Sequence, residues 1–133
     1  MITMYDSDID MLEVGEEGYK TVGKNVSDAL TLFYTEDGDL VGFLLDNASE
    51  NFRELDLVPR RMQLAGLVRL ARGLLGCSQK ELAEILDIGH RSVQRLEAGE
   101  GNPTLDSLQA LVEAAPAKID FSVLLVKQRQ AQI

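Results

Sequence analysis

Residues 78–97 read SQKELAEILDIGHRSVQRLE, and this stretch decides the fold of the chain. Ser78 followed by Glu81 three residues later is a capping box, a pattern that satisfies free backbone N–H groups where a helix begins. Three apolar residues then follow at the spacing of one helix face: Leu82, Ile85 and Leu86. The stretch therefore predicts an amphipathic helix that begins at residue 79.

This helix pattern breaks at residues 87–89. Asp87 tolerates the left-handed backbone conformation and Gly89 adopts it freely, so a tight turn is expected there. A second apolar stripe consists of Ile88, Val93 and Leu96. The side chains left facing outward are His90, Arg91, Ser92, Gln94 and Arg95. The sequence thus predicts two short helices joined by a turn.

The outward side chains of the second helix are of the types that read DNA. An Arg side chain can donate two hydrogen bonds to guanine in the major groove, and Gln can pair in a similar way with adenine. A short helix that carries such groups and is braced by another helix suits major-groove reading. Most polar helix faces are only solvated surface, but the spacing of the whole stretch favours DNA reading over that alternative.

A wider set of residues shares this spacing: Arg72, Gly76, Ser78-Gln79, Leu82-Ala83, Ile88, Val93, Leu96-Glu97, Gly99 and Asn102-Pro103-Thr104-Leu105. On these residues, positions 61–115 resemble the Cro/C1-type (Xre) helix-turn-helix family. The resemblance implies a lambda-repressor-like helical domain that binds double-stranded DNA. It also implies that this protein is a transcriptional regulator whose reading helix covers about residues 89–97.

The resemblance implies a role for individual residues. Gln79 would bind a DNA phosphate from the start of the supporting helix. Three residues would face bases or nearby phosphates, with Ser92 and Gln94 adjacent to them: His90, Arg91 and Arg95. Arg72 in the first helix would pair with Glu97 at the end of the reading helix.

Some residues depart from the family pattern. Gly89 stands where a Ser or Thr usually caps the reading helix, which predicts a weaker cap. Asp87 replaces the usual Gly of the turn, and Cys77 takes a position normally held by Leu. Glu100 occupies a loop position where a Lys or Arg often contacts phosphate. Together these departures predict modest DNA affinity.

Charge divides the chain into two unequal parts. The 133 residues carry a net charge of −9. Residues 1–57 hold 14 Asp or Glu against three Lys or Arg, a net charge of −11, whereas residues 58–133 hold eight against ten, a net charge of +2. We therefore expect an acidic domain at 1–57 and a near-neutral DNA-reading domain at 58–133, whose non-specific DNA binding is weak and salt-sensitive.

The acidic part predicts a small antiparallel sheet, so the expected fold class is α+β. β-forming residues cluster at 2–5, 11–14, 29–35 and 40–45, and Asp37-Gly38 between the last two is a strong hairpin signal. Residues 15–26 are expected to form a loop. Residues 2–50 resemble a small bacterial β-domain family of unknown function, through Tyr5-Asp6, Asp10, Leu12 and the stretch Asp37-Gly38-Asp39-Leu40-Val41-Gly42.

The remaining segments are expected to connect or extend these two parts. Residues 47–57 are predicted to be a polar linker that ends in a short helix, followed by a helix from Arg60 to Leu75 in which Gly73 weakens the helix by about 1 kcal/mol relative to Ala. Its predicted apolar stripe is Leu64, Leu67, Val68, Ala71 and Leu75. Thr104 caps a further helix, whose expected core residues are Leu105, Leu108, Leu111 and Val112. Residues 119–123 alternate apolar and polar side chains, which predicts a strand paired with the N-terminal sheet or with a second subunit, and Lys127–Ile133 is expected to be a frayed end.

Enzymatic and metal-binding functions are not expected. Cys77 is the only cysteine, so a cysteine-rich zinc site is not expected. His90, the only histidine, lies far in sequence from Cys77, and no Ser-His-Asp or Cys-His arrangement stands out. Asp6, Asp8 and Asp10 alternate as at the start of a calcium-binding EF-hand loop, but a polar turn is the better interpretation because the later Gly and Glu are missing. The sequence predicts no cofactor, no membrane segment and a cytoplasmic location.

Three functions remain open, with a DNA-binding regulator first. Its expected partners are double-stranded DNA and a second copy of the chain, since a homodimer reads two half-sites. The second function is an antitoxin of a toxin–antitoxin pair that binds a toxin and regulates its own expression, suggested by the small size and the strand-like tail. The third is a protein-interaction module without DNA binding, which the acidic balance and Glu100 favour.

Overall fold

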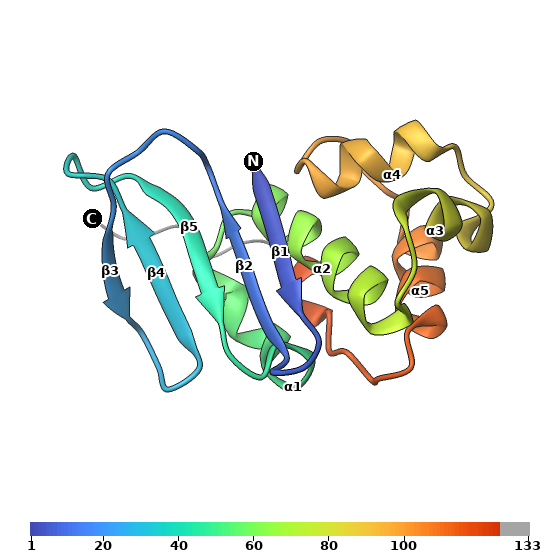
Figure 1. Ribbon diagram of the computed structural model, residues 1–133, viewed down its shortest axis with the longest axis horizontal. Helices are drawn as coiled ribbons and strands as arrows, with labels where there is room; N and C mark the ends of the chain where they lie inside the picture. Colours follow the sequence, from blue (N-terminus) through green and yellow to red (C-terminus); the bar gives the residue numbers. More distant parts are fainter. Residues whose placement is uncertain (126–133) are drawn as a thin grey trace.

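A computed structural model describes residues 1–125, in which a five-stranded antiparallel sheet lies beside a helical domain (Figure 1). The strands are β1 (Ile2–Asp6), β2 (Met11–Gly15), β3 (Val22–Asn25), β4 (Leu30–Tyr34) and β5 (Leu40–Leu45). The α-helices are α1 (Ala48–Asn51), α2 (Arg60–Leu75), α3 (Gln79–Leu86), α4 (His90–Glu97) and α5 (Leu105–Ala114). Two 3-10 helices complete the described part: η1 (Phe52–Leu57) and η2 (Ser122–Leu124). The predicted α+β class, with the sheet preceding the helices, is confirmed.

The sheet has the strand order β1-β2-β5-β4-β3, and every neighbouring pair is antiparallel. β4 and β5 form the predicted hairpin, in which Gly38 has a φ of 90° and its N–H donates to the carbonyl of Thr35 at 3.0 Å. The expected loop at 15–26 is wrong for residues 22–25, which form β3. All four residues of β3 are exposed, so no alternation of burial marked them, and pairing with β4 holds the strand in place.

Helix α2 lies between the sheet and the group formed by α3, α4 and α5 (Figure 1). It has the predicted bounds, and its buried residues are Met62, Gln63, Leu64, Ala65, Gly66, Leu67, Val68, Leu70 and Ala71. A Cβ added at Gly66 would lie only 3.2 Å from Leu12 Cδ2 and 3.3 Å from Phe43 Cζ, so the sheet approaches α2 closely there. One hydrophobic core continues from the strands through α2 into α3, α4 and α5. The domain boundary after Leu57 stays a prediction.

The segment before α2 is not the polar linker that was expected. It folds into α1 and η1, and three of its side chains are fully buried: Ala48, Phe52 and Leu55. These positions are four and three residues apart, which places them on one face of a helix. The Asp10 carboxylate anchors the segment, because it accepts hydrogen bonds from Ser49 Oγ and Tyr5 Oη, both at 2.6 Å.

The hydrogen bonds of Asp10 concern the resemblance of Asp6, Asp8 and Asp10 to a calcium-binding loop. Its carboxylate already joins the β1–β2 turn to α1, and the Asp6 carboxylate accepts the N–H of Asp8 at 2.9 Å. No cluster of three His, Cys, Asp or Glu side chains among residues 1–125 is arranged to hold a metal ion. These acids therefore act as turn and anchor groups.

The predicted strand at residues 119–123 is wrong. The chain there forms a turn leading into η2, in which Asp120 Oδ1 accepts the N–H of Ser122 at 3.1 Å. The buried side chains of this stretch are Ile119, Val123 and Leu124. They pack near η1 and α2 instead of pairing with a sheet edge, and Arg60 donates a hydrogen bond to the carbonyl of Leu124. The apolar side chains of this stretch are therefore buried against helices. Alternation of apolar and polar residues does not by itself show whether the buried side chains pack on helices or belong to a paired strand. The predicted frayed end Lys127–Ile133 lies outside the described residues.

Two apolar side chains expected in the core are exposed. Ile85 on α3 and Leu105 on α5 are 52% and 54% exposed. On α3, the buried side chains are Leu82 and Ala83, so the core-facing side of this two-turn helix lies away from Ile85. Leu105 is the first residue of α5, before the helix turns its buried face to the core at Leu108.

A tight contact explains the glycine inside α2. A Cβ at Gly73 would lie 2.9 Å from Tyr5 Cε2 and closer still to Cδ2. We expect Gly73→Ala to lower the free energy of unfolding by about 1 kcal/mol, because overlap with the ring costs about 1–3 kcal/mol and exceeds the gain in helix propensity of about 1 kcal/mol. Urea unfolding measures the change. In a Tyr5→Ala background the same substitution should be neutral or stabilising; stabilisation in the wild-type background would contradict the assigned contact.

Candidate nucleic-acid interface

The supporting helix α3 begins at the predicted capping box. Ser78 Oγ accepts the N–H of Glu81 at 3.1 Å, and the Glu81 carboxylate accepts the N–H of Ser78 at 3.1 Å. The hydrogen bond from the Ser78 backbone N–H contributes most to lowering the pKa of Glu81, because it favours the charged carboxylate. Gln79, the first residue of α3, is half-buried, and Lys80 after it is exposed. The capping box therefore places an amide and an ammonium group at the positive end of a helix dipole.

A tight turn at residues 87–89 sets α4 against α3. Asp87 has a φ of 54°, the left-handed conformation expected for it, and the N–H of Ile88 donates to the carbonyl of Ala83 at 3.0 Å. Gly89 is the N-cap of α4 and provides no side-chain hydrogen bond, so the predicted weak cap is confirmed. Leu82, Ala83 and the fully buried Val93 lie in the core between the two helices. The two-helix unit is thus held by turn geometry and apolar packing.

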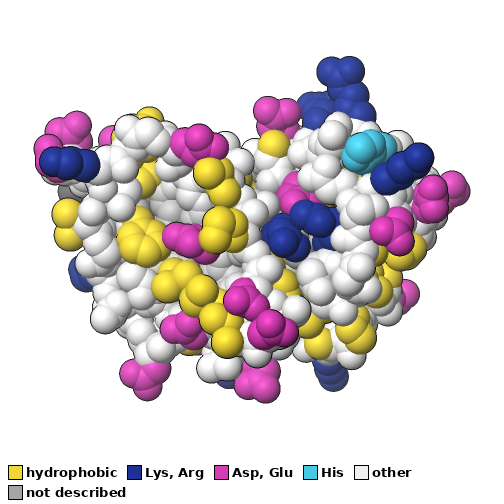
Figure 2. All heavy atoms as spheres, in the orientation of Figure 1, with side chains coloured by type: hydrophobic (Ala, Val, Ile, Leu, Met, Phe, Trp, Pro, Cys, Tyr) yellow, Lys and Arg dark blue, Asp and Glu magenta, His cyan; other side chains and the backbone are white. Residues whose placement is uncertain are grey.

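The predicted reading face of α4 is exposed in the part of the chain that the structure describes, residues 1–125. Five residues are exposed: His90, Arg91, Ser92, Gln94 and Arg95. Figure 1 shows α4 on the side of α2 away from β3, β4 and β5, and Figure 2 shows Lys, Arg and His side chains gathered over α4. The acidic sheet does not cover this face.

A buried ion pair fixes the end of α4. Arg72 Nη2 lies 2.8 Å from Glu97 Oε1, and Arg72 Nε donates to Oε2 at 3.1 Å. Thr3 Oγ1 on β1 donates to the same carboxylate at 3.4 Å, and Arg72 also donates to the carbonyl of Cys77 at 3.3 Å. Glu97 is only 8% exposed. Four partners therefore connect α2, α4, the sheet and the loop before α3.

Arg95 on the reading face already has an acidic neighbour. Its Nε lies 3.7 Å from Glu100 Oε2, and the backbone N–H of Glu100 donates to the carbonyl of Arg95 at 2.8 Å. Both side chains are exposed, so the pair itself adds little stability. Ser92 and Arg95 also line a hollow of about 210 Å³ between α4, α5 and α2. Arg91 has no ion pair within residues 1–125, so it is the guanidinium of α4 that is free to meet DNA.

The structure adds a cation that the sequence did not single out. Arg69 on α2 is half-buried beside Tyr5, and its pKa is lowered, first by burial and then by the charge of Arg72. Its only sequence signal was its position three residues before Arg72, which places both on one helix face. Burial also raises the pKa of the Cys77 thiol, which gives this cysteine the character of a packing residue.

Comparison with protein families confirms what this geometry indicates. Residues 68–121 match the family described as helix-turn-helix. Over this stretch the chain is similar to helix-turn-helix domains of the Cro/C1 type. The matched stretch begins within α2 and includes α3, α4 and α5, while the five-stranded sheet lies outside it. The match supports a DNA-binding regulator.

Two further comparisons gave no relatives for this chain. A search of curated proteins found no match, and a search of solved structures found none either. Within residues 1–125, every helix is too short or too polar to cross a membrane.

Proposed function

We propose that this helix-turn-helix protein is a sequence-specific, double-stranded DNA-binding transcriptional regulator of the cytoplasm. In this proposal α4 lies in the major groove, and α3 packs against α4 and supports it. The exposure of every outward side chain of α4 carries the proposal, because a reading helix must be free of its own chain.

Each exposed residue has a role that its chemistry supports. Arg91 is unpaired within the described residues and is proposed to read a guanine edge. His90, Ser92 and Gln94 are proposed to contact neighbouring bases or phosphates, and Arg95 does so in competition with Glu100. Gln79, at the N-terminus of α3, is proposed to bind a phosphate, since a helix N-terminus favours an anion.

The acidic sheet is compatible with DNA binding because of where its charge lies. β1 is the strand that contacts α4, through Thr3 and Glu97. Neighbouring strands lie about 4.8 Å apart, so β3 is roughly 20 Å from β1. That separation is about 2.5 times the Debye length of roughly 8 Å at physiological salt. β3, β4 and β5 themselves carry no Asp or Glu, and the acids of the turns that join them are Asp28, Glu36, Asp37 and Asp39. These turn acids are therefore largely screened from DNA at α4.

The proposed binding unit is a homodimer. One short helix contacts only a few base pairs, which limits its specificity. Two copies of α4 that enter successive major grooves, about 34 Å apart, would read a pseudo-palindrome. Each half-site would then contribute independently to specificity.

Replacing Arg91 tests the proposed reading role. We expect Arg91→Ala to weaken binding to the selected operator by about 1–3 kcal/mol, roughly 5- to 150-fold, and to relax the preference at one base position. Operator sequences are first obtained by selection from random DNA, and affinity is then measured at several salt concentrations. Arg53→Ala is the matched control, because Arg53 is exposed on η1 and should change affinity by less than about twofold. Full affinity in Arg91→Ala would contradict the role, and no DNA binding even at low salt would favour a protein-interaction module.

A second function is favoured by the apolar surface of the sheet. An antitoxin binds its toxin through protein contacts and can regulate its own expression through a DNA-binding domain. The exposed hydrophobic residues of β1 suit such a contact. Specific co-purification with a small protein encoded beside this gene would support that function.

A further inference from the structure

The outer face of the sheet is unusually apolar. An antiparallel sheet that packs one face on a core normally presents polar residues on the other. Here Ile2 and Met4 project from β1 on the open face, with Phe33 on β4 and the exposed Tyr19 nearby. Figure 2 shows hydrophobic side chains gathered over the sheet with acidic groups among them. Contiguous exposed apolar surface of this kind marks an interaction site.

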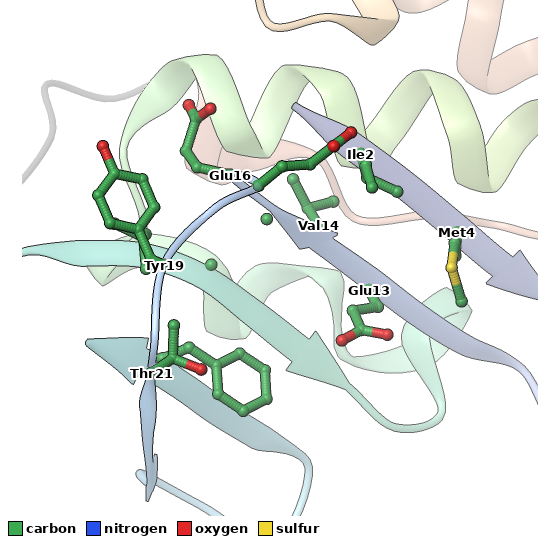
Figure 3. Close-up of a pocket in the computed structure, with 12 residues that line it drawn as sticks. Ile2, Met4, Glu13, Val14, Glu16, Tyr19 and Thr21 are labelled. Atoms are coloured by element: carbon green, nitrogen blue, oxygen red, sulfur yellow. The ribbon is translucent and has the colours of Figure 1, made fainter. Parts of the chain in front are cut away.

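A hollow of about 270 Å³ opens in this face. Its floor includes Gly15 and Gly42, which are direct partners across β2 and β5. A Cβ at Gly42 would lie 2.7 Å from the carbonyl oxygen of Val14, so only glycine fits the backbone there. Figure 3 shows Ile2 and Met4 on one side of the hollow and Tyr19 and Thr21 on the other. The hollow is therefore built by strand register, and its volume is large enough to receive a side chain.

The hollow also carries negative charge. Glu13 lies between Met4 and Thr21 (Figure 3), and its register neighbours are Met4 on β1 and Leu44 on β5. Within residues 1–125, its carboxylate has neither an ion pair nor a side-chain hydrogen bond. Glu17 at the rim is exposed and likewise unpaired within that range.

Glu16, which precedes Glu17 in the chain and also lines the hollow, is already paired with cations of the protein itself. It pairs with Arg61 and lies 3.8 Å from the N-terminal ammonium group. These cations lower its pKa, the hydrogen bond from Arg61 contributing most. The unpaired Glu13 and Glu17 offer equivalent sites to cations from outside the chain.

We propose that this hollow binds a basic, amphipathic segment of a partner protein. One apolar side chain of the segment enters above Gly15 and Gly42, and its flanking Lys or Arg side chains pair with Glu13 and Glu17. A central apolar anchor surrounded by charge-assisted hydrogen bonds is the usual anatomy of a binding hot spot.

Charge selects this occupant over the other candidates. A second copy on a two-fold axis would bring the same patch against itself, so Glu13 and Glu17 would face their own copies and repel. DNA would be repelled by the same carboxylates. The net charge of −11 on residues 1–57 extends the attraction for a cationic partner beyond the hollow and would speed its association.

The test uses three synthetic helical peptides on the full-length protein. The first has Leu on one face and Lys on the other; the second replaces Lys with Glu, and the third replaces Leu with Ser. We expect the Leu/Lys peptide to bind, with backbone NMR shifts confined to β1, β2 and β5. Glu13→Lys and Met4→Ser should each weaken binding by about tenfold or more. Glu50→Lys, an equal charge change on exposed α1, should change it by less than about twofold.

Several outcomes would overturn this proposal. The first is that the Leu/Lys peptide does not bind. The second is that the Leu/Glu or the Ser/Lys peptide binds as tightly as the Leu/Lys peptide. The third is that Glu13→Lys and Glu50→Lys reduce the affinity for the Leu/Lys peptide equally. A dimer in sedimentation that Met4→Ser dissociates would assign the face to a second copy instead. Operator affinity of Met4→Ser is measured in parallel and should match wild type, so failure here is distinguishable from failure of the DNA-binding proposal.

Discussion

Arg72→Met is expected to lower the free energy of unfolding by about 3–5 kcal/mol, because it leaves a buried carboxylate without its counter-charge. Among residues 1–125, Glu97 would keep only the hydrogen bond from Thr3 Oγ1, whose 3.4 Å length marks a weak interaction. Urea unfolding followed by far-ultraviolet circular dichroism measures the loss. Since Glu97 ends α4, we also expect weaker operator binding in this variant.

Two further variants separate the buried pair from charge loss in general. Arg95→Met removes an arginine whose partner, Glu100, is exposed, and should cost less than about 1 kcal/mol. The double variant Arg72→Met/Glu97→Leu should be more stable than Arg72→Met alone, because no uncompensated charge remains. If Arg72→Met and Arg95→Met lost equal stability, or if the double variant were the least stable, the ion pair would not have the role assigned here.

Phe52→Ala is expected to destabilise the protein by about 3–5 kcal/mol, as is typical of a buried phenylalanine whose removal leaves a cavity. Phe52 is fully buried at the start of η1, in the segment that the sequence predicted to be a linker. Thermal and urea unfolding measure the change, and near-ultraviolet signals report whether packing is lost throughout the core.

Leu57→Ala is the matched control for this measurement. Leu57 ends the same 3-10 helix, but its side chain is 41% exposed. We expect a loss of less than about 1 kcal/mol, because little apolar area leaves a buried environment. A similar loss in both variants, or a loss below about 1 kcal/mol for Phe52→Ala, would show that the segment does not belong to the core.

The elements that the sequence predicted well are those specified by local chemistry. The capping box at Ser78 and Glu81, the left-handed Asp87 and the Asp-Gly hairpin each need only a few neighbouring residues. β3 and the segment 119–123 depend on distant partners. β3 has an exposed residue at every position, so only its pairing with β4 makes it a strand. The apolar residues of 119–123 pack beside η1 and α2, which no periodicity within the segment encodes.

The same distinction applies to the functional surfaces. The exposed residues of α4 could be predicted from helical spacing. Because Val93 faces the core, the residues one and two positions away from it in the helix are turned away from the core. The side-chain distance between Arg72 and Glu97 required the structure, although the family resemblance paired them. The hollow on the sheet was not predicted, since Gly15 and Gly42 meet only through the register of β2 and β5.

Helix α2, which has buried side chains toward both the sheet and the helices, constrains how this protein can evolve. Shuffling a foreign sheet onto the helix-turn-helix domain would place unmatched side chains opposite Gly66 and Gly73, where there is no room for them. Under the proposed reading role of α4, in contrast, new operator preferences would need only point mutations at its exposed residues, which do not contribute to the core. DNA specificity is therefore free to diverge between lineages, while the sheet and α2 are expected to covary.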